Sequence, residues 1–176
     1  MLFSGCMKST DKVNAYKITP NAHSAVTPES KANNEGWTMR HRAILNRVSH
    51  GNVDLIFIGD SITQGWENNG IDPWKQFGNA QDVWQHYYGR RNAVNLGIGG
   101  DTTQNVLWRL NNGDIAGISP KLAVIMIGTN NSNGNDNTAK EIGEGIIAIC
   151  QKLRADLPTT KILILAIFPR GEKPSP

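Results

Sequence analysis

The chain has 176 residues, of which 39% are hydrophobic, and this length suits one domain with a sizeable core. Its 18 Lys and Arg residues against 15 Asp and Glu residues leave a formal net charge of +3, and the absence of a basic stripe argues against nucleic acid as a partner. Two cysteines, Cys6 and Cys150, give no disulfide framework or Cys/His zinc spacing, and no apolar run approaches the roughly 18 residues of a membrane-spanning helix.

Residues 1–36 are predicted to form a polar N-terminal tail, a linker or an extended wrap. Residues 8–34 contain few apolar side chains and many Ser, Thr, Asn, Lys and Pro residues, which bury too little surface to offset the entropy of ordering. The short run that ends at Cys6 resembles the end of a bacterial lipoprotein signal, in which the cysteine becomes lipidated. Two localisations stay open: an exported lipoprotein anchored at Cys6, and a cytoplasmic protein with an ordinary N-terminus.

Residues 37–176 are predicted to form the folded domain. A helix from Thr38 onward stops at Gly51, and its apolar side is expected to carry Met39, Ile44, Leu45 and Val48. Four continuous apolar runs are typical of strands buried on both faces, and they cover residues 54–59, 93–96, 122–127 and 161–168.

Two further helical patterns lie between these runs, at residues 106–110 and 142–157. The second begins at Thr138 and Glu141, which have capping-box spacing, and ends before Pro158. Cys150 falls on its apolar stripe and is expected in the core. Strands that alternate with helices predict the α/β class, as a three-layer α/β/α sandwich around a parallel sheet.

Polar residues and glycines follow three of the predicted strands. The motifs are GDSITQG at residues 59–65, GIGGDTT at residues 97–103 and GTNN at residues 128–131. Each motif alone is compatible with an ordinary turn or helix cap. Because the carboxyl ends of parallel strands meet at one edge of a sheet, the three together predict a site there.

These residue types suit acyl transfer, which needs a hydroxyl nucleophile and donors for the oxyanion that develops. Ser61, at a strand-to-helix turn, is the candidate nucleophile, and its own amide is one donor. The Gly100 amide, with no Cβ in the way, and the side-chain amide of Asn130 are the other two. The motif differs from the G-x-S-x-G nucleophile elbow because Thr63 replaces the second glycine, which disfavours a standard α/β-hydrolase.

The three motifs resemble the first three sequence blocks of the SGNH, or GDSL, hydrolases. Residues 95–103, 106–110 and 169–174 are similar to the catalytic subunits of intracellular platelet-activating-factor acetylhydrolase and their bacterial relatives. The resemblance runs from about Trp37 to the end of the chain. It implies a flavodoxin-like SGNH hydrolase fold without a metal or organic cofactor, with Ser61 as nucleophile and with Gly100 and Asn130 completing the oxyanion hole.

Two features depart from the family pattern. The fourth block, Asp-x-x-His, which supplies the general base, is absent, and the four histidines are expected to be surface or packing residues: His23, His41, His50 and His86. The chain also stops directly after the fourth predicted strand, whereas the family, with strand order 2-1-3-4-5, continues through another strand and a final helix. We therefore expect a fragment whose fourth strand is an apolar edge open to pairing or homo-oligomerisation.

The sequence leaves two function classes open. The first is a serine esterase or acetylhydrolase that removes short acyl groups, acetyl above all, from a small-molecule or carbohydrate ester; Trp66 is the candidate lining residue of its acyl pocket. The second is a non-catalytic module that binds an acylated or anionic ligand in the same pocket. A nucleotide-phosphate loop at residues 97–100 and a calcium site at residues 130–137 are disfavoured, because the sequence patterns that they need are missing.

Overall fold

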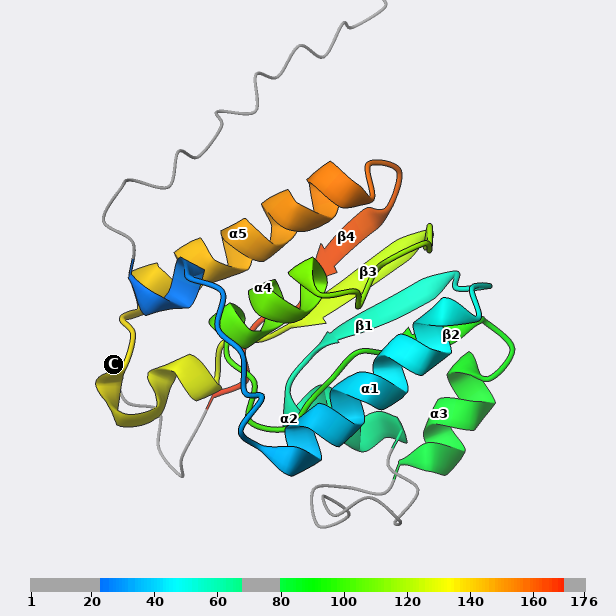
Figure 1. Cartoon of the computed structure of the whole chain (residues 1–176), viewed down its shortest axis with the longest axis horizontal. Helices are drawn as coiled ribbons and strands as arrows, with labels where there is room; N and C mark the ends of the chain where they lie inside the picture. The colour runs from blue at the N-terminus through cyan, green and yellow to red at the C-terminus, as the bar shows by residue number, and fades with distance from the viewer. Residues whose placement is uncertain (1–22, 68–79, 170–176) are drawn as a thin grey trace, which may run out of the picture.

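The fold is built on a parallel sheet of four strands in the order β2-β1-β3-β4, and the computed structural model describes residues 23–67 and 80–169 (Figure 1). The strands are β1 (Leu55–Gly59), β2 (Ala93–Asn95), β3 (Leu122–Met126) and β4 (Lys161–Ile164). This confirms the predicted α/β class and parallel sheet. Cys6, on which the lipoprotein prediction depends, lies outside the described residues.

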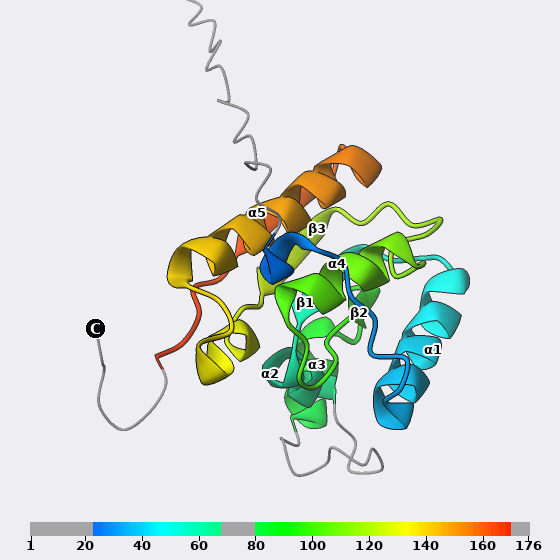
Figure 2. The same cartoon turned by 60° about the vertical axis from the view of Figure 1, so that its left-hand side comes forward.

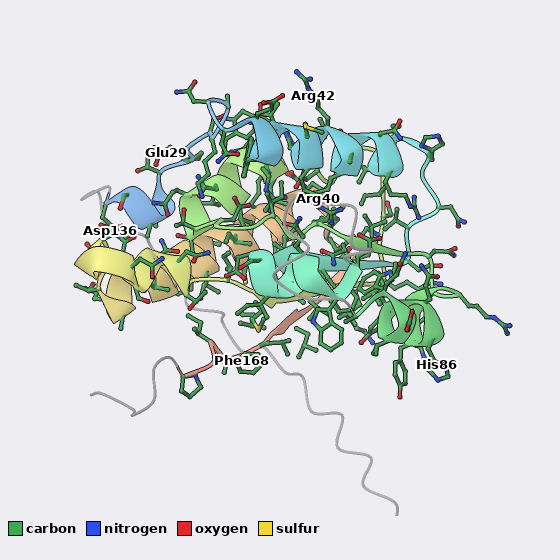
Figure 3. The ribbon with its side chains drawn as sticks, turned by 90° about the horizontal axis from the view of Figure 1, so that it is seen from below. Glu29, Arg40, Arg42, His86, Asp136 and Phe168 are labelled. Carbon is green, nitrogen blue, oxygen red and sulfur yellow. The ribbon has the colours of Figure 1, made fainter. Side chains whose placement is uncertain are left out.

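Helices cover both faces of the sheet. On one face, α1 (Glu35–Ser49), α4 (Thr103–Asn111) and α5 (Ala139–Asp156) share a core with Ile56 and Ile58 of β1. On the other face, Phe57 packs on α3 (Gln81–Tyr88), with ring centroids 5.2 Å from Trp84 and 4.9 Å from Tyr88. Successive side chains of a strand point to opposite faces, so β1 is covered on both sides. Figure 3 shows α1 and α3 on opposite sides of the sheet.

The buried face of α1 differs from the prediction. Met39 was expected on the apolar side, but its residue surface is 59% exposed. The buried residues are instead Trp37, His41, Ile44 and Val48, which follow one another at intervals of four, three and four. Because a helix has 3.6 residues per turn, this spacing defines one face, and Met39 lies away from it.

The predicted boundaries of α5 are confirmed and have the expected cause. Thr138 accepts a hydrogen bond from the Glu141 amide, and the Glu141 carboxylate accepts one from the Thr138 amide in return. The helix ends at Asp156, ahead of Pro158. Cys150 is half-buried and packs against the core, and burial raises the pKa of its thiol.

The fourth strand is shorter and more exposed than predicted. It ends at Ile164, and residues 165–168 continue outside it with Phe168 61% exposed. The last backbone bond to β3 in this region is from the Leu165 amide to the Ile125 carbonyl, 2.8 Å long. In the described part of the chain no strand pairs with the outer side of β4. Leu163 and Ile164, which point to opposite faces of the strand, are both about half exposed, so the prediction of burial on both faces is wrong for β4.

Residues 23–34, which we call the N-terminal strap, pack on α4 and α5. In Figures 1 and 2 the strap runs from the start of α5 across α4 to α1. His23 Nε2 forms a hydrogen bond of 2.7 Å with a carboxylate oxygen of Glu144, and the Glu29 amide donates to the Gln104 carbonyl over 3.1 Å. A Cβ at Gly145 would lie 2.7 Å from the Ala25 carbonyl oxygen, so the glycine permits this close approach. No helix among the described residues has the length and apolarity to cross a membrane.

Candidate active site

Ser61 lies at the junction between β1 and the short helix α2 (Ser61–Gln64). Asp60 is buried and caps this helix, since its carboxylate accepts a hydrogen bond of 3.0 Å from the Ile62 amide. Gly59 makes the tight turn sterically feasible, because a Cβ there would lie 2.0 Å from Thr63 Oγ1 and 2.6 Å from the Met126 carbonyl oxygen. Within the described residues, neither the Ser61 hydroxyl nor its amide has a hydrogen-bond partner.

The loop after β2 is fastened to α2 by side chains. Asn95 Nδ2 donates to the Thr63 carbonyl over 2.7 Å, and Gln64 Oε1 accepts from the Gly99 amide over 2.7 Å. A Cβ at Gly97 would lie 2.5 Å from the Gln64 amide nitrogen, so this contact also needs glycine. The helix that carries Ser61 and the loop that carries Gly100 are therefore held as one unit.

Gly100 occupies the left-handed region with a φ of +76°, where residues with a Cβ are disfavoured. Its carbonyl accepts a hydrogen bond from Lys31 Nζ of the N-terminal strap. Its amide has no acceptor in the described part of the molecule. The predicted second donor is consequently free to bind a ligand.

Asn130 begins the 3-10 helix η4 (Asn130–Asn135), at the end of the loop that follows β3. Its Nδ2 donates to the Asp101 carbonyl over 2.8 Å, which joins this loop to the one that carries Gly100. The neighbouring Asn131 is fully buried, and its Oδ1 accepts from the Thr103 amide over 3.0 Å. The structure thus brings the loops of Ser61, Gly100 and Asn130 together at one sheet edge, while their catalytic roles stay predictions.

A buried ion-pair network lies directly behind the Gly100 loop. Arg109 of α4 pairs with Asp101 through Nε, 2.9 Å away, and with Asp114 through Nη1. Trp37 of α1 donates from Nε1 to the other carboxylate oxygen of Asp101 over 2.7 Å. Burial disfavours charge on Arg109, but the two aspartates outweigh it and raise the pKa of the guanidinium. The network fixes the loop against both helices.

None of the four histidines has a described contact with Ser61. His41 is buried between Trp37 and Trp108, with its Nε2 3.1 Å from a carboxylate oxygen of Asp114. His23 pairs with Glu144, and His50 contacts the Asn46 carbonyl. His86 packs against the ring of Tyr87. In Figure 3, His86 projects from α3 on the side of the molecule away from α1. These contacts fit the predicted surface and packing roles.

Apolar side chains next to Ser61 remain open to solvent. Ile62 is 41% exposed, and Trp66, in the 3-10 helix η2 (Gly65–Glu67), is 44% exposed. Both apolar side chains lie within five residues of the candidate nucleophile in the sequence, one in α2 and the other in η2. Among residues 23–67 and 80–169, no group of three His, Cys, Asp or Glu side chains is arranged to hold a metal ion.

Comparison with known proteins identifies the family. Residues 57–176 match the model of the GDSL-like Lipase/Acylhydrolase family. The chain belongs to this family. The match covers more than half of the chain and includes all three loops of the candidate site.

Individual relatives agree with this assignment. The chain is 38% identical over 140 residues to platelet-activating factor acetylhydrolase IB subunit alpha2 of Homo sapiens, covering 80% of this chain and 55% of that protein. It is 33% identical over 157 residues to subunit alpha1 of Bos taurus, covering 89% and 61%. The chain thus spans little more than half the length of these relatives.

Solved structures show the same fold. A Streptococcus pneumonia protein described as a platelet activating factor superposes with a TM-score of 0.58 at 27% identity, covering 78% of this chain and 57% of that one. A GDSL-like lipase from Bacteroides thetaiotaomicron gives a TM-score of 0.53 at 20% identity, over 78% and 60%. Both support the SGNH hydrolase fold that the sequence resemblance implied.

Proposed function

We propose that this chain carries the nucleophile and the oxyanion hole of a serine esterase that removes short acyl groups, acetyl above all, through an acyl-serine intermediate. The observation that carries the proposal is a pair of hydrogen bonds, from the Gly99 amide to Gln64 Oε1 and from Asn130 Nδ2 to the Asp101 carbonyl. They unite three loops whose Ser61 and Gly100 amides lack acceptors among the described residues. Membership of an acylhydrolase family and the acetylhydrolase relatives support the reaction class.

In the proposed reaction, Ser61 Oγ attacks the ester carbonyl carbon, and the carbonyl π electrons move to the oxygen. The resulting oxyanion receives hydrogen bonds from the Ser61 amide, the Gly100 amide and Asn130 Nδ2. The proton of the hydroxyl passes to a base and then to the departing alcohol as the tetrahedral intermediate collapses. Water then cleaves the acyl-serine by the same steps. The family resemblance assigns the base to a histidine of an Asp-x-x-His block, and none of the four histidines of this chain matches that block.

Covalent labelling of Ser61 tests the proposal. A fluorophosphonate should phosphonylate the 176-residue chain once, and Ser61→Ala should abolish the labelling. Ser132→Ala is the control, because Ser132 is an exposed serine in η4 whose Oγ donates to the Thr129 carbonyl. A serine hydroxyl without a general base is a weak nucleophile, so the labelling is slow and is followed over hours at high reagent concentration. Labelling that persists in Ser61→Ala, or that never occurs, would contradict the assignment and favour a ligand-binding module.

Acyl-chain preference tests the substrate class. Ile62 and Trp66 are exposed apolar side chains close to Ser61 in the sequence, and we infer that they contact a short acyl group. With acetyl, butyryl and octanoyl esters of one aryl alcohol, the rate should fall as the chain lengthens. A rate that rises from acetyl to octanoyl would overturn the short-acyl proposal while leaving the esterase proposal intact.

A further inference from the structure

Lys31 is the one residue of the N-terminal strap whose side chain reaches the Gly100 loop in the described contacts. Its Nζ donates to the Gly100 carbonyl and lies 4.0 Å from a carboxylate oxygen of Asp101. A Cβ placed on Gly100 would meet this same Nζ at 3.6 Å. The contact joins residues 69 positions apart in the sequence, and neither the sequence motifs nor the family comparison assigns a role to Lys31.

The strap holds Lys31 firmly on both sides. Before it, the Glu29 carbonyl accepts a hydrogen bond of 3.0 Å from Asn105 Nδ2 of α4. After it, Asn34 caps α1 by accepting a bond of 2.9 Å from the Trp37 amide, and Trp37 itself binds Asp101. The Lys31 side chain is 32% exposed, and burial lowers the pKa of its ammonium group while Asp101 opposes the change. A partly buried ammonium group on a carbonyl makes a charge-assisted hydrogen bond, which is stronger than a neutral one.

The free amide of Gly100 lies between two fixed points. On one side, the Gly99 amide is held by Gln64 of the helix that carries Ser61. On the other side, the Gly100 carbonyl is held by Lys31. Glycine adopts many backbone conformations, so an amide flanked by Gly99 and Gly100 points in one direction only if its neighbours are restrained.

We propose that Lys31 is a positioning residue, which holds the Gly100 carbonyl so that the Gly100 amide faces the oxyanion. The inference rests on the proposed function and adds to it a residue outside the three family motifs. Lys31 acts through Gly100 and does not touch the reacting atoms. Its loss should therefore slow the chemical step and leave the binding of the reagent unchanged.

Phosphonylation kinetics of Lys31→Met and Lys31→Arg test the inference. Lys31→Met should lower the maximal rate of phosphonylation about tenfold without changing the half-saturating concentration, as expected for a misplaced donor. Lys31→Arg should restore most of the rate because it keeps a cationic donor. Lys140→Met is the matched control, since Lys140 is 81% exposed on α5. The three variants should unfold at the same temperature as the wild type.

A second readout examines the contact itself. In Lys31→Met, the NMR shifts of the Gly100 carbonyl carbon and the Asp101 amide nitrogen should change, while those of Ser61 and Asn130 stay in place. If Lys31→Met is phosphonylated as fast as the wild type, the inference about Lys31 is overturned and the proposed function stands. A wild-type chain that is never labelled would overturn the proposed function, and the NMR shifts would still show whether Lys31 restrains Gly100. An equal loss in Lys31→Arg and Lys31→Met would also contradict the positioning role.

Discussion

The side-chain amide of Asn130 has two protons, and the structure uses one of them. That proton is donated in a hydrogen bond to the Asp101 carbonyl, which fixes the side chain, and the other proton has no acceptor among the described residues. A neutral amide stabilises an oxyanion without titrating over the physiological pH range. Asn130 therefore combines a structural bond with the proposed catalytic one.

Replacing Asn130 with alanine should remove one oxyanion donor. We expect the rate of Ser61 phosphonylation to fall roughly 10²- to 10³-fold, which is the usual effect of losing such a donor. Asn133→Ala in the same 3-10 helix is the control, because Asn133 is exposed. The measurement is the phosphonylation rate together with the thermal unfolding temperature, and equal rates in the two variants would show that Asn130 is not a donor.

The sequence was sufficient to nominate Ser61, Gly100 and Asn130, because each lies in a motif that follows a predicted strand and resembles a family block. It did not indicate Lys31, Trp37 or Arg109. The contacts of Lys31 and Trp37 to the Gly100 loop span 69 and 64 residues, and no local pattern encodes such pairings. Only Arg109 left a trace in the sequence, because it is a charged residue next to the apolar stripe of α4. Such a position indicates a buried ion pair, and Arg109 does pair with Asp101.

At the scale of elements, α5 was predictable at both ends because its cap and stop are chemical features of the local sequence. Helix α3 was not predicted, since its single buried residue, Trp84, gives no apolar period. The length of β4 was overestimated because an apolar run does not reveal where strand pairing stops. Register with β3 determines that limit, and the last paired residues are Ile125 and Ile164.

The cap of α5 should make stability depend on acid. Hydrogen bonds from the Thr138 amide and hydroxyl hold the pKa of Glu141 below its ordinary value of 4.5. A carboxyl group with a lowered pKa stabilises the fold fully above that ordinary value, and this contribution is lost as the pH falls through the lowered pKa. Glu141→Gln keeps the capping geometry without the charge.

Urea unfolding of Glu141→Gln at about pH 7 and about pH 3 measures this contribution. We expect the difference in unfolding free energy between the two pH values to be smaller in the variant than in the wild type. Glu35→Gln is the control, because the Glu35 carboxylate in the first turn of α1 has no hydrogen bond in the described residues. The same acid sensitivity in all three proteins would exclude Glu141 as its source.

At the scale of the whole molecule, the outer edge of β4 has no paired strand among residues 23–67 and 80–169. Large apolar residues on and after β4 are at least 38% exposed, namely Leu163, Ile164, Leu165, Ile167 and Phe168. Figure 3 shows Phe168 pointing away from the body of the molecule. An uncovered apolar strand edge favours pairing with another strand.

We expect the 176-residue chain to self-associate through this edge. Leu163→Lys should shift the protein toward the monomer in analytical ultracentrifugation over a series of concentrations, because a charge on an edge strand opposes pairing. Val83→Lys, a substitution on the exposed face of α3, is the control. A wild-type chain that stays monomeric at every concentration would contradict this expectation.

The N-terminal strap also imposes an order on biosynthesis. Residues 23–34 leave the ribosome well before Glu144, the partner of His23, which lies 121 positions downstream. Such distant pairings slow folding, because the intervening chain must close a large loop before they form. The strap can therefore complete its contact with α5 only after Glu144 has been translated.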